Sequence, residues 1–317
     1  MKVYLSFLII FFLQFSANNT IAKEVPVFEI LDESIVDYTF LYGGKQLVVC
    51  KSWGIEIWDM KTKSKIHKLN NSDIQFNTCI DISPDNRFVV AGGWDGKVFL
   101  WDLKSLEIVW ELKTDNKILD VEIAPDNLSI AVASSNSNIY KINLINGEIT
   151  GILKEHRLDV MSLEFKDEGK YLFSASADKS IIVWDYKEGI VVNQLSDHDN
   201  VIKDISFNSD ESRLISCGLD GVISIWYIKN IKNITLLQKD KISRSWLSNV
   251  NYYKDGSSYI SSDLSGKIFL FAKVNLTKNF KKPIIRTEFV PKEGDAIEIM
   301  VLIQNYGICI YDVAAMY

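Results

Sequence analysis

The sequence predicts an all-β fold in which one structural unit is repeated along the chain. Three observations support this class. First, a His, a Ser, an Asp and a Trp recur at one constant offset of 42 residues in two successive segments, EHRLDVMSLEFKDEGKYLFSASADKSIIVWD and DHDNVIKDISFNSDESRLISCGLDGVISIWY. Second, short β-rich runs alternate with tight turns after residue 22. Third, no stretch after that residue has the length and periodicity of an ordinary helix.

Length and composition fit a single globular domain. The chain has 317 residues, of which 47% are hydrophobic and 24% charged, as in an ordinary folded protein. Each repeat unit is too small to bury its own apolar face, so the units must pack on one another in one closed domain. The formal net charge of −6 argues against a general nucleic-acid binder, because such proteins carry a basic patch or stripe.

The N-terminal segment predicts export. Lys2 precedes a mostly apolar run from Val3 to Phe15, which is shorter than the roughly 20 residues needed to span a bilayer. This pattern is typical of a secretory signal peptide, here residues 1–22, with cleavage before Lys23. The mature chain, residues 23–317, is then periplasmic or extracellular and has no stable membrane span. The alternatives are an uncleaved anchor, a buried first strand, or a cytoplasmic protein whose start has been misread.

The repeat period places seven equivalent strand ends along the chain. Successive positions lie 40 to 45 residues apart and are Trp58, Trp101, Ile142, Trp184, Trp226, Phe271 and Tyr311. An Asp or Asn follows five of them, and the departures are Tyr227 and Ala272. A period of this length that closes on Trp-Asp resembles the WD-repeat family. The resemblance runs from about residue 23 to the end, and it implies a single seven-bladed β-propeller of four-stranded antiparallel blades.

Tight turns separate the strands expected within each repeat. Asp95-Gly96, Asp220-Gly221 and Ser265-Gly266 are typical hairpin turns before the strand that carries the anchor residue. The turns before the middle strand, at 83–86, 124–127 and 254–256, are rich in the Pro, Asp, Asn and Gly that suit turn backbones. A fourth, outer strand is expected after each anchor, as at 65–69 and 108–112.

The two ends of the repeat region predict how the ring closes. The last repeat stops at Tyr317, five residues after Asp312, which leaves no room for an outer strand. The segment Val25 to Ile30 precedes the first repeat and is similar to the outer strands. We expect it to supply the fourth strand of the last blade, because closure removes exposed sheet edges.

Two of the three histidines are expected to lie near an Asp and a Ser in the fold. Such a constellation could act in acid–base catalysis or hold a metal. In WD-repeat blades, however, these residue types form a buried hydrogen-bond network in which the Asp orients the imidazole, the hydroxyl bridges and the indole donates its N–H. The resemblance implies that structural role for two sets: His156, Ser174, Asp178 and Trp184, and His198, Ser216, Asp220 and Trp226. The third, His67, is expected to face solvent from an outer strand.

Other repeats depart from this pattern. Ala91 stands where the second repeat would carry its Ser, and Ile142 replaces the Trp of the third. The sixth repeat has Ser265 and Phe271 at the Asp and Trp positions. We expect these blades to be held by apolar packing more than by polar networks.

Motifs of the common enzyme classes are missing from the sequence. It contains no G-x-S-x-G, H-E-x-x-H or P-loop pattern, and no His/Cys cluster has zinc spacing. We also expect no repeated set of spare carboxylates around the channel, of the kind that holds calcium or a quinone in some propellers. No catalytic residue, metal or cofactor is therefore predicted. Cys50, Cys79, Cys217 and Cys309 are expected to be buried free thiols.

The favoured function is binding of a protein or peptide on one face of the propeller. In WD-repeat proteins, partners commonly dock on the face whose loops hold the His and the turn Asp, and Trp and Arg often dominate binding energy. The candidate residues on that face are Trp94, Trp246, Arg244, Arg157, Asp159 and Leu219. The two tryptophans could instead fill gaps between irregular blades. The alternatives to a non-catalytic monomeric scaffold are an exported propeller hydrolase or quinone-dependent enzyme, and an intracellular adaptor.

Overall fold

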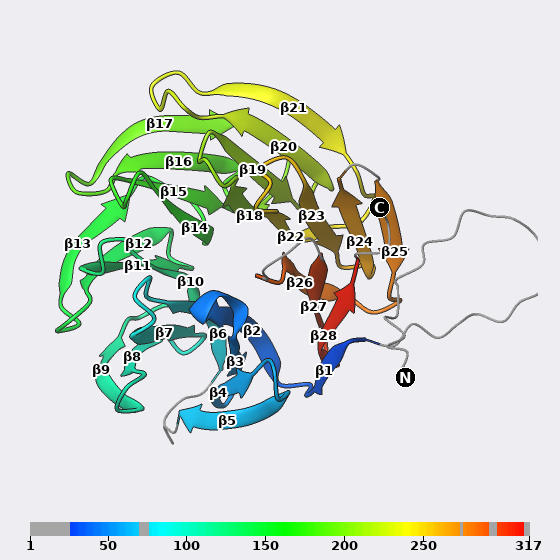
Figure 1. Ribbon diagram of the computed structural model, residues 1–317. Helices are drawn as coiled ribbons and strands as arrows, with labels where there is room; N and C mark the ends of the chain where they lie inside the picture. The colour runs from blue at the N-terminus through cyan, green and yellow to red at the C-terminus, as the bar shows by residue number, and fades with distance from the viewer. Residues whose placement is uncertain (1–25, 70–75, 273–274, 292–296, 314–317) are drawn as a thin grey trace, which may run out of the picture.

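A computed structural model describes residues 26–69, 76–272, 275–291 and 297–313 of the chain. Across these ranges the chain forms seven four-stranded antiparallel sheets, arranged as blades around a central axis (Figure 1). The predicted all-β fold of a seven-bladed β-propeller is therefore confirmed. The single helical element of the described residues is the short 3-10 turn η1 (Tyr42–Gly44).

The first six blades are each formed by four strands that are consecutive in the sequence. Blade 1 consists of β2 (Ile35–Leu41), β3 (Gln46–Lys51), β4 (Gly54–Asp59) and β5 (Ser64–Leu69). Blade 2 consists of β6 (Asn77–Ile82), β7 (Phe88–Gly93), β8 (Lys97–Asp102) and β9 (Glu107–Lys113). Blade 3 consists of β10 (Ile118–Ile123), β11 (Ser129–Ser134), β12 (Asn138–Asn143) and β13 (Ile149–Lys154). Blade 4 consists of β14 (Val160–Lys166), β15 (Tyr171–Ser176), β16 (Ser180–Asp185) and β17 (Ile190–Ser196). Blade 5 consists of β18 (Ile202–Phe207), β19 (Arg213–Gly218), β20 (Val222–Tyr227) and β21 (Thr235–Lys241). Blade 6 consists of β22 (Leu247–Tyr252), β23 (Tyr259–Asp263), β24 (Lys267–Phe271) and β25 (Leu276–Asn279).

The seventh blade combines the two ends of the chain. It contains β26 (Ile284–Phe289), β27 (Glu298–Ile303) and β28 (Gly307–Asp312), with β1 (Phe28–Leu31) as its outer strand. Phe28 lies opposite Ile310, and Leu31 lies opposite Gly307. The N-terminal segment thus closes the ring as predicted, although the strand spans Phe28–Leu31 rather than Val25–Ile30.

A glycine makes the close pairing at this seam possible. Gly307 has a φ of +133°, and a Cβ atom at this position would lie 1.9 Å from the carbonyl oxygen of Ile30. Both the backbone conformation and the lack of space exclude a larger residue. The last blade therefore depends on Gly307 to accept β1.

The seven anchor residues all lie on the third strand of a blade. Trp101 on β8 and Trp184 on β16 are almost completely buried, opposite Val89 and Leu172 of the second strands. In five blades the pairing between the third and fourth strands shifts register at the anchor. Such bulges bend the outer strand and increase its twist. The anchor thus fills the space between blades where the outer strand turns away.

Apolar side chains fill the spaces between neighbouring blades. Because a blade is covered on both faces, most of its second strand is buried, and in β7 all residues from Phe88 to Gly93 are buried. Outer strands are more exposed, and β21 is exposed along its whole length. Burial of one Val, Leu or Ile side chain contributes about 1.5–3 kcal/mol, so packing between blades is the main source of stability. All four cysteines are buried free thiols, as predicted.

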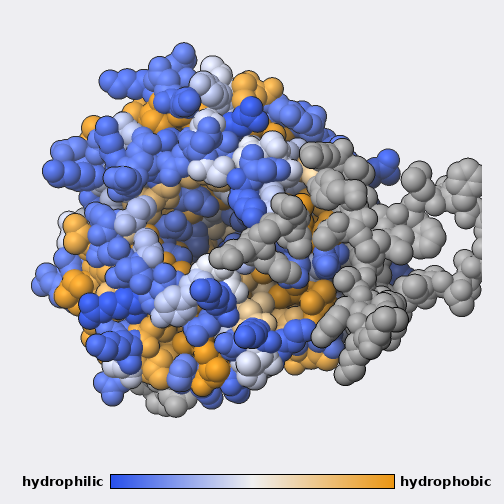
Figure 2. All heavy atoms as spheres, viewed as in Figure 1, coloured by the Kyte–Doolittle hydropathy of each residue, from blue (hydrophilic) through white to orange (hydrophobic). Residues whose placement is uncertain are grey.

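A channel runs along the propeller axis. The first strand of each blade lies nearest the axis and the fourth lies at the perimeter, as β14 and β17 show (Figure 1). Seen from the same side, the centre of the ring is hollowed and bordered largely by hydrophilic residues (Figure 2). The channel encloses about 210 Å³ and is lined by the first strands of all seven blades.

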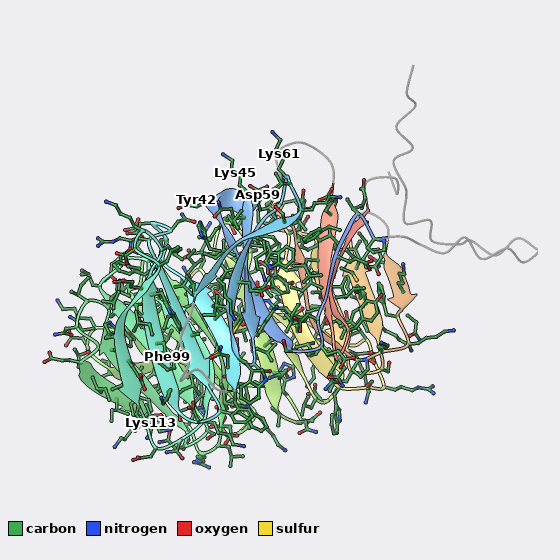
Figure 3. All side chains as sticks on the ribbon, turned by 90° about the horizontal axis from the view of Figure 1, so that it is seen from below. Tyr42, Lys45, Asp59, Lys61, Phe99 and Lys113 are labelled. Atoms are coloured by element: carbon green, nitrogen blue, oxygen red, sulfur yellow. The ribbon has the colours of Figure 1, made fainter. Side chains whose placement is uncertain are left out.

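The two faces of the propeller carry different connections. Tyr42, Lys45, Asp59 and Lys61 lie at one face, and Lys113 lies at the other (Figure 3). The second face carries the turns between the second and third strands and the links from each outer strand to the next blade. We call it the linker face. It is the face on which the binding candidates were predicted.

The predicted signal segment, residues 1–22, lies outside the described residues. Within the part of the chain that the structure describes, no helix has the length and apolar character to cross a bilayer.

Candidate binding face and central channel

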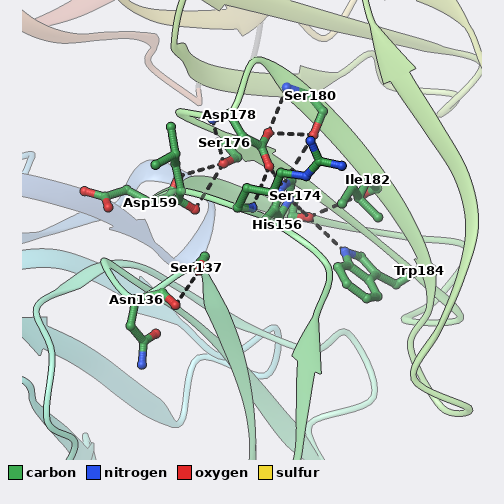
Figure 4. Close-up of polar contacts among 12 residues, drawn as sticks. Asn136, Ser137, His156, Asp159, Ser174, Ser176, Asp178, Ser180, Ile182 and Trp184 are labelled. Carbon is green, nitrogen blue, oxygen red and sulfur yellow. Dashed lines mark hydrogen bonds and ion pairs between the residues drawn. The ribbon is translucent and has the colours of Figure 1, made fainter.

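The first predicted set of four residues comes together in blade 4 (Figure 4). His156 Nδ1 lies 2.9 Å from Asp178 Oδ2, and His156 Nε2 lies 2.8 Å from Ser174 Oγ. The indole N–H of Trp184 donates to the same Ser174 oxygen at 2.8 Å. The four residues connect the link before the blade, its second strand, the turn after that strand and its third strand in one polar chain.

The second set repeats this geometry in blade 5. His198 lies 2.9 Å from both Asp220 Oδ2 and Ser216 Oγ, through Nδ1 and Nε2 respectively. Trp226 Nε1 donates to Ser216 Oγ at 3.2 Å. The constant sequence offset between the two sets therefore corresponds to one and the same arrangement in adjacent blades.

The electrostatics of these sets favour a structural role. Both imidazole side chains are completely buried, and both nitrogens of each ring are engaged within the protein. Burial raises the pKa of Asp178 and Asp220, but the hydrogen bonds and charge of the histidines, together with backbone N–H donors, outweigh it and hold the pKa of both carboxyl groups below the usual value. Neither histidine presents a free nitrogen to a substrate.

Blades that lack the set of His, Ser, Asp and Trp have different hydrogen bonding at the equivalent positions. In blade 2 the Trp101 Nε1 group is buried without a hydrogen-bond partner, because Ala91 offers no oxygen. In blade 3 the Asn136 amide donates to the Tyr140 hydroxyl at 2.9 Å. Apolar packing holds the second blade, as expected.

The sixth blade has a polar network that was not predicted. Asp263 is fully buried and accepts hydrogen bonds from Ser243 Oγ at 2.7 Å and from Ser265 Oγ at 2.7 Å. The backbone N–H of Lys267 adds a third at 2.9 Å. A serine thus stands at the position of the histidine, and the expectation of mainly apolar packing was wrong for this blade.

Carboxylates line the central channel and were not predicted as a group from the sequence. The pairing of first and second strands defines seven equivalent positions, each just after a register shift: Asp37, Cys79, Asp120, Ser162, Asp204, Asn249 and Arg286. Two residues further along each strand stand Thr39, Asp81, Glu122, Glu164, Ser206, Asn251 and Glu288. Six carboxylates border the cavity, together with Arg286 and Lys203.

Several of these side chains bind the backbone of the next blade. Asp37 Oδ2 accepts from the Ile80 N–H at 3.1 Å, and Asp120 Oδ2 accepts from the Leu163 N–H at 2.7 Å. Asp204 and Asn249 make the equivalent bonds to the two following blades, at 2.9 and 2.8 Å. The channel residues therefore hold neighbouring blades together.

Burial in the channel also raises the pKa values of several acidic side chains. Burial raises the pKa of Asp81 to about 6 and that of Asp120 to about 8, and nearby carboxylates contribute in the same direction. Burial and the neighbouring acids likewise raise the pKa of Glu122 and Glu164. Among the described residues, no three His, Cys, Asp or Glu side chains are grouped so that they could hold a metal ion.

The predicted binding residues are all on the linker face, but they do not form one cluster. Trp94 is 56% exposed on blade 2, and Trp246 is 55% exposed at the start of blade 6. Arg157 and Arg244 are exposed, whereas Asp159 and Leu219 are half-buried. Blades 2 and 6 are not neighbours in the ring, so Trp94 and Trp246 belong to separate surfaces.

Two residues beside Trp94 were missed by the sequence analysis. Trp53 is 55% exposed and Phe76 is 48% exposed, and their ring centroids lie 4.7 Å apart. The Trp94 backbone N–H donates to the Phe76 carbonyl at 2.8 Å, which places both on one surface. We call Trp53, Phe76 and Trp94 the aromatic patch. Trp53 occupies the same hairpin of blade 1 that Trp94 occupies in blade 2, a signal that comparison of the turns could have revealed.

Comparison with known proteins supports the repeat assignment. A family model described as "WD domain, G-beta repeat" matches residues 64–102, 147–185 and 189–227. These ranges fall in blades 1 to 5, and each ends one residue after an anchor Trp. The second and third ranges contain the two complete sets of His, Ser, Asp and Trp.

Curated relatives match about half of the chain or less. Transcription factor unc-37 of Caenorhabditis elegans is 28% identical over 152 residues, which cover 48% of this chain and 24% of that protein. Small ribosomal subunit protein RACK1 of Neurospora crassa is 24% identical over 148 residues, or 44% of this chain and 46% of that protein. MST50-interacting protein 11 of Pyricularia oryzae is 23% identical over 148 residues, with the same coverage of 44% and 46%.

The aligned part of this chain thus spans less than half of the length of each of these relatives. The family match, the relatives, the anchor period and the seven observed blades agree with one another. The chain carries WD repeats and has the seven-bladed propeller fold, and both are consistent with the WD-repeat β-propeller family.

Proposed function

We propose that the protein is a non-catalytic interaction scaffold that binds a protein or peptide partner on its linker face, at the aromatic patch. The observation that carries this proposal is the clustering of Trp53, Phe76 and Trp94, each about half exposed, across the junction of blades 1 and 2. Exposed aromatic side chains that lie together are typical of interaction sites, since Trp and Tyr supply much of the binding energy at interfaces.

The exposure of the patch favours binding over gap filling. A tryptophan that fills a gap between blades is buried, as Trp101 and Trp184 are. Trp94 instead has one face covered by the Lys117 ammonium group, which lies 4.1 Å from the ring centroid. This contact restricts the indole without burying it, which lowers the entropy cost of presenting it to a partner.

Similarity to known proteins adds support of a general kind. One matched relative is named for an interaction with another protein, MST50. Because the match covers under half of each chain, it supports only the class of function, which is binding of another protein, and it does not identify the partner.

The competing proposal is an enzyme with its site in the central channel. The observation in its favour is the group of carboxylates whose pKa values are raised by burial, a property common at catalytic sites. Four of the polar channel residues bind backbone N–H groups of the next blade, which gives them a structural role. Native mass spectrometry of the purified protein separates the two: a stoichiometric metal or cofactor would favour the enzyme.

Export remains part of the proposal. The composition of residues 1–22 supports removal of a signal peptide, and the alternative is a cytoplasmic protein. N-terminal sequencing of the protein from its native source distinguishes them, because export predicts that the chain begins at or near Lys23.

Affinity capture with tagged variants tests the binding face. Trp53→Ala and Trp94→Ala are expected to lose the captured partner while the melting temperature stays within about one degree of the wild type, since exposed substitutions rarely change stability. Ile190→Ala is the matched control, because Ile190 is 58% exposed on the outer strand β17. Trp246→Ala tests the second surface. Loss of fold together with loss of binding would support the gap-filling alternative.

A further inference from the structure

We infer that the linker face carries a second docking surface, centred on Trp246 and Leu264 of blade 6, whose occupant is an acidic peptide segment with a large apolar side chain. This inference goes beyond the proposed function, because it concerns a surface separate from the aromatic patch and states the chemistry of the occupant. The contacts, the exposure and the charges at the start of blades 6 and 7 carry it.

A backbone hydrogen bond that recurs on the linker face shows that blades 2 and 6 present equivalent apolar pairs. In blade 2 the Trp94 N–H donates to the Phe76 carbonyl, and in blade 6 the Leu264 N–H donates to the Trp246 carbonyl at 3.0 Å. Both side chains of the second pair are exposed, Trp246 to 55% and Leu264 to 37%. Blade 6 therefore has an apolar pair of its own, at the position that Phe76 and Trp94 occupy in blade 2.

The link that leads into blade 7 lies against the turn that follows Leu264. The Phe280 N–H donates to the Gly266 carbonyl at 2.7 Å. A Cβ atom on Gly266 would lie 2.5 Å from the Lys282 carbonyl oxygen and 3.0 Å from the Lys281 nitrogen, so only a glycine lets the link pack here. Lys281 and Lys282 therefore lie beside the apolar pair and belong to the same surface.

Exposed cations flank this pair on two sides. Arg244 lies two positions before Trp246 in the link into blade 6, and Lys281 and Lys282 lie in the link into blade 7. All three side chains are exposed, and neither link contains an acidic residue. The Lys282 ammonium group lies 4.5 Å from the ring centroid of Tyr306, a contact that restrains the side chain while leaving it exposed.

Nearby acids are engaged by other groups. Asp197 pairs with Lys239, and Glu288 pairs with Arg286, each at 3.3 Å. Asp263 is fully buried and accepts its hydrogen bonds within the blade. The three exposed cations thus give this surface a local positive charge, although the whole chain has a formal net charge of −6. An acidic segment is complementary to that charge, and Trp and Arg are the residue types that most often dominate binding energy.

Exposed acids limit the surface to two blades. Asp199 lies in the link into blade 5, and Glu33 lies in the link into blade 1. A long nucleic acid or an anionic bilayer would extend over these carboxylates and be repelled by them, whereas a short peptide segment fits between them. Nucleic acid and lipid are therefore outcomes of the test.

A matched set of fluorescently labelled peptides tests the inference. The first has a central Leu-Phe pair flanked by glutamates, the second has glutamines in place of the glutamates, and the third has Gly-Gly in place of the apolar pair. The first peptide is expected to bind the protein at least about tenfold more tightly than either counterpart, and added salt is expected to weaken its binding. Equal affinity for the first peptide and either counterpart, or no binding of the first, would overturn the inference.

Substitutions locate the bound peptide. Trp246→Ala is expected to weaken binding at least about tenfold, and Lys281→Gln with Lys282→Gln is expected to reduce both the affinity and its dependence on salt. Lys229→Gln with Lys232→Gln is the matched control, because it removes two exposed lysines from the connection between β20 and β21. The melting temperature of each variant shows whether it is folded. A loss of affinity in the control equal to that in the test pair, or no loss in Trp246→Ala, would contradict the inference.

Competition identifies the class of occupant. Neither an oligothymidylate nor phosphatidylcholine vesicles that contain phosphatidylglycerol are expected to displace the first peptide. Displacement by either one that depends on Trp246 and on the two lysines would assign the surface to nucleic acid or to lipid and would overturn the acidic peptide.

The two surfaces of the linker face are tested independently. Trp53→Ala and Trp94→Ala are expected to leave the affinity for the first peptide unchanged. If those variants still capture the native partner while the peptide depends on Trp246 and the lysines, the proposed function fails and this inference stands. If the peptide depends on Trp94 as strongly as on Trp246, the second surface is not separate and this inference fails.

Discussion

Arg286 donates a hydrogen bond from Nη1 to Asp37 Oδ1 at 2.7 Å, although 249 positions separate the two residues in sequence. The pair joins the first strand of blade 7 to the first strand of blade 1. Arg286 also donates to Glu288 at 3.3 Å and lies over the ring of Tyr38, with its guanidinium carbon 5.0 Å from the centroid. The ring is thus closed twice, by β1 at the perimeter and by this ion pair at the axis.

Removal of the Arg286 guanidinium group should weaken the contact between blades 7 and 1 at the axis and so lower the free energy of unfolding. Arg286→Met leaves Asp37 and Glu288 without their cationic partner in a largely enclosed channel, so we expect a loss of about 2 kcal/mol in the free energy of unfolding. Chemical denaturation measures this value. Arg87→Met is the matched control, since Arg87 pairs with Asp102 at 3.1 Å but is 59% exposed, and its loss should cost no more than about 0.5 kcal/mol. Equal effects of the two substitutions would contradict the prediction.

The hydroxyl of Ser174, which bridges His156 and Trp184 in blade 4, should contribute more to stability than a hydroxyl on the surface. Ser174→Ala leaves His156 Nε2 and Trp184 Nε1 buried without their shared partner, so we expect a destabilisation of about 1–3 kcal/mol. Ser209→Ala on the surface is expected to change stability by less than about 0.5 kcal/mol. Thermal or urea unfolding of both variants decides between a structural network and a dispensable one.

Blade 2 offers the reverse experiment. Trp101 Nε1 is buried without a partner, and Ala91 occupies the position that Ser174 and Ser216 occupy in blades 4 and 5. Ala91→Ser supplies the missing acceptor, and we expect a gain of about 0.5–1.5 kcal/mol, the net value of one hydrogen bond. A decrease in stability would show that the core around Ala91 has no room for the hydroxyl or leaves its proton unpaired.

The channel predicts how stability depends on pH. Burial and the nearby Asp37 and Asp204 raise the pKa of Asp120 from 3.8 to about 8 in the folded protein. As the pH rises, Asp120 therefore loses its proton at a lower pH in the unfolded chain than in the folded protein. The contribution of the protonated Asp120 side chain to stability is complete below about pH 4 and is lost as the pH rises towards 8. We expect a lower melting temperature at pH 8 than at pH 5.

Asp120→Asn tests the origin of this dependence. The amide oxygen can still accept the hydrogen bond from the Leu163 N–H, but the site no longer titrates. The difference in melting temperature between pH 5 and pH 8 should therefore shrink. Asp115→Asn at the exposed link before β10 should leave the difference as it is in the wild type. An unchanged difference in the Asp120 variant would assign the pH dependence to other groups.

The candidate site was only partly predictable. Trp94 was identified because it precedes a turn Asp in a clear repeat, whereas Trp53 lies in a shorter turn, Ser52-Trp53, without that Asp. The acids of the first strands were also missed as a set. Asp120, Glu122, Glu164 and Asp204 interrupt strands that otherwise read as apolar, and such interruptions are the signal that could have indicated a polar channel.

The sequence alone determined the period of the repeat, the number of blades, the third-strand anchors and the four-residue sets, because these follow from local patterns that recur at constant spacing. Only the tertiary structure decided which side chains of different blades meet. Trp53 and Phe76 contact each other, and the first-strand acids face one channel, because ring closure sets the distance between blades and the bulges set which side chains face the axis. Those relations depend on the geometry of the whole ring, which no single repeat contains.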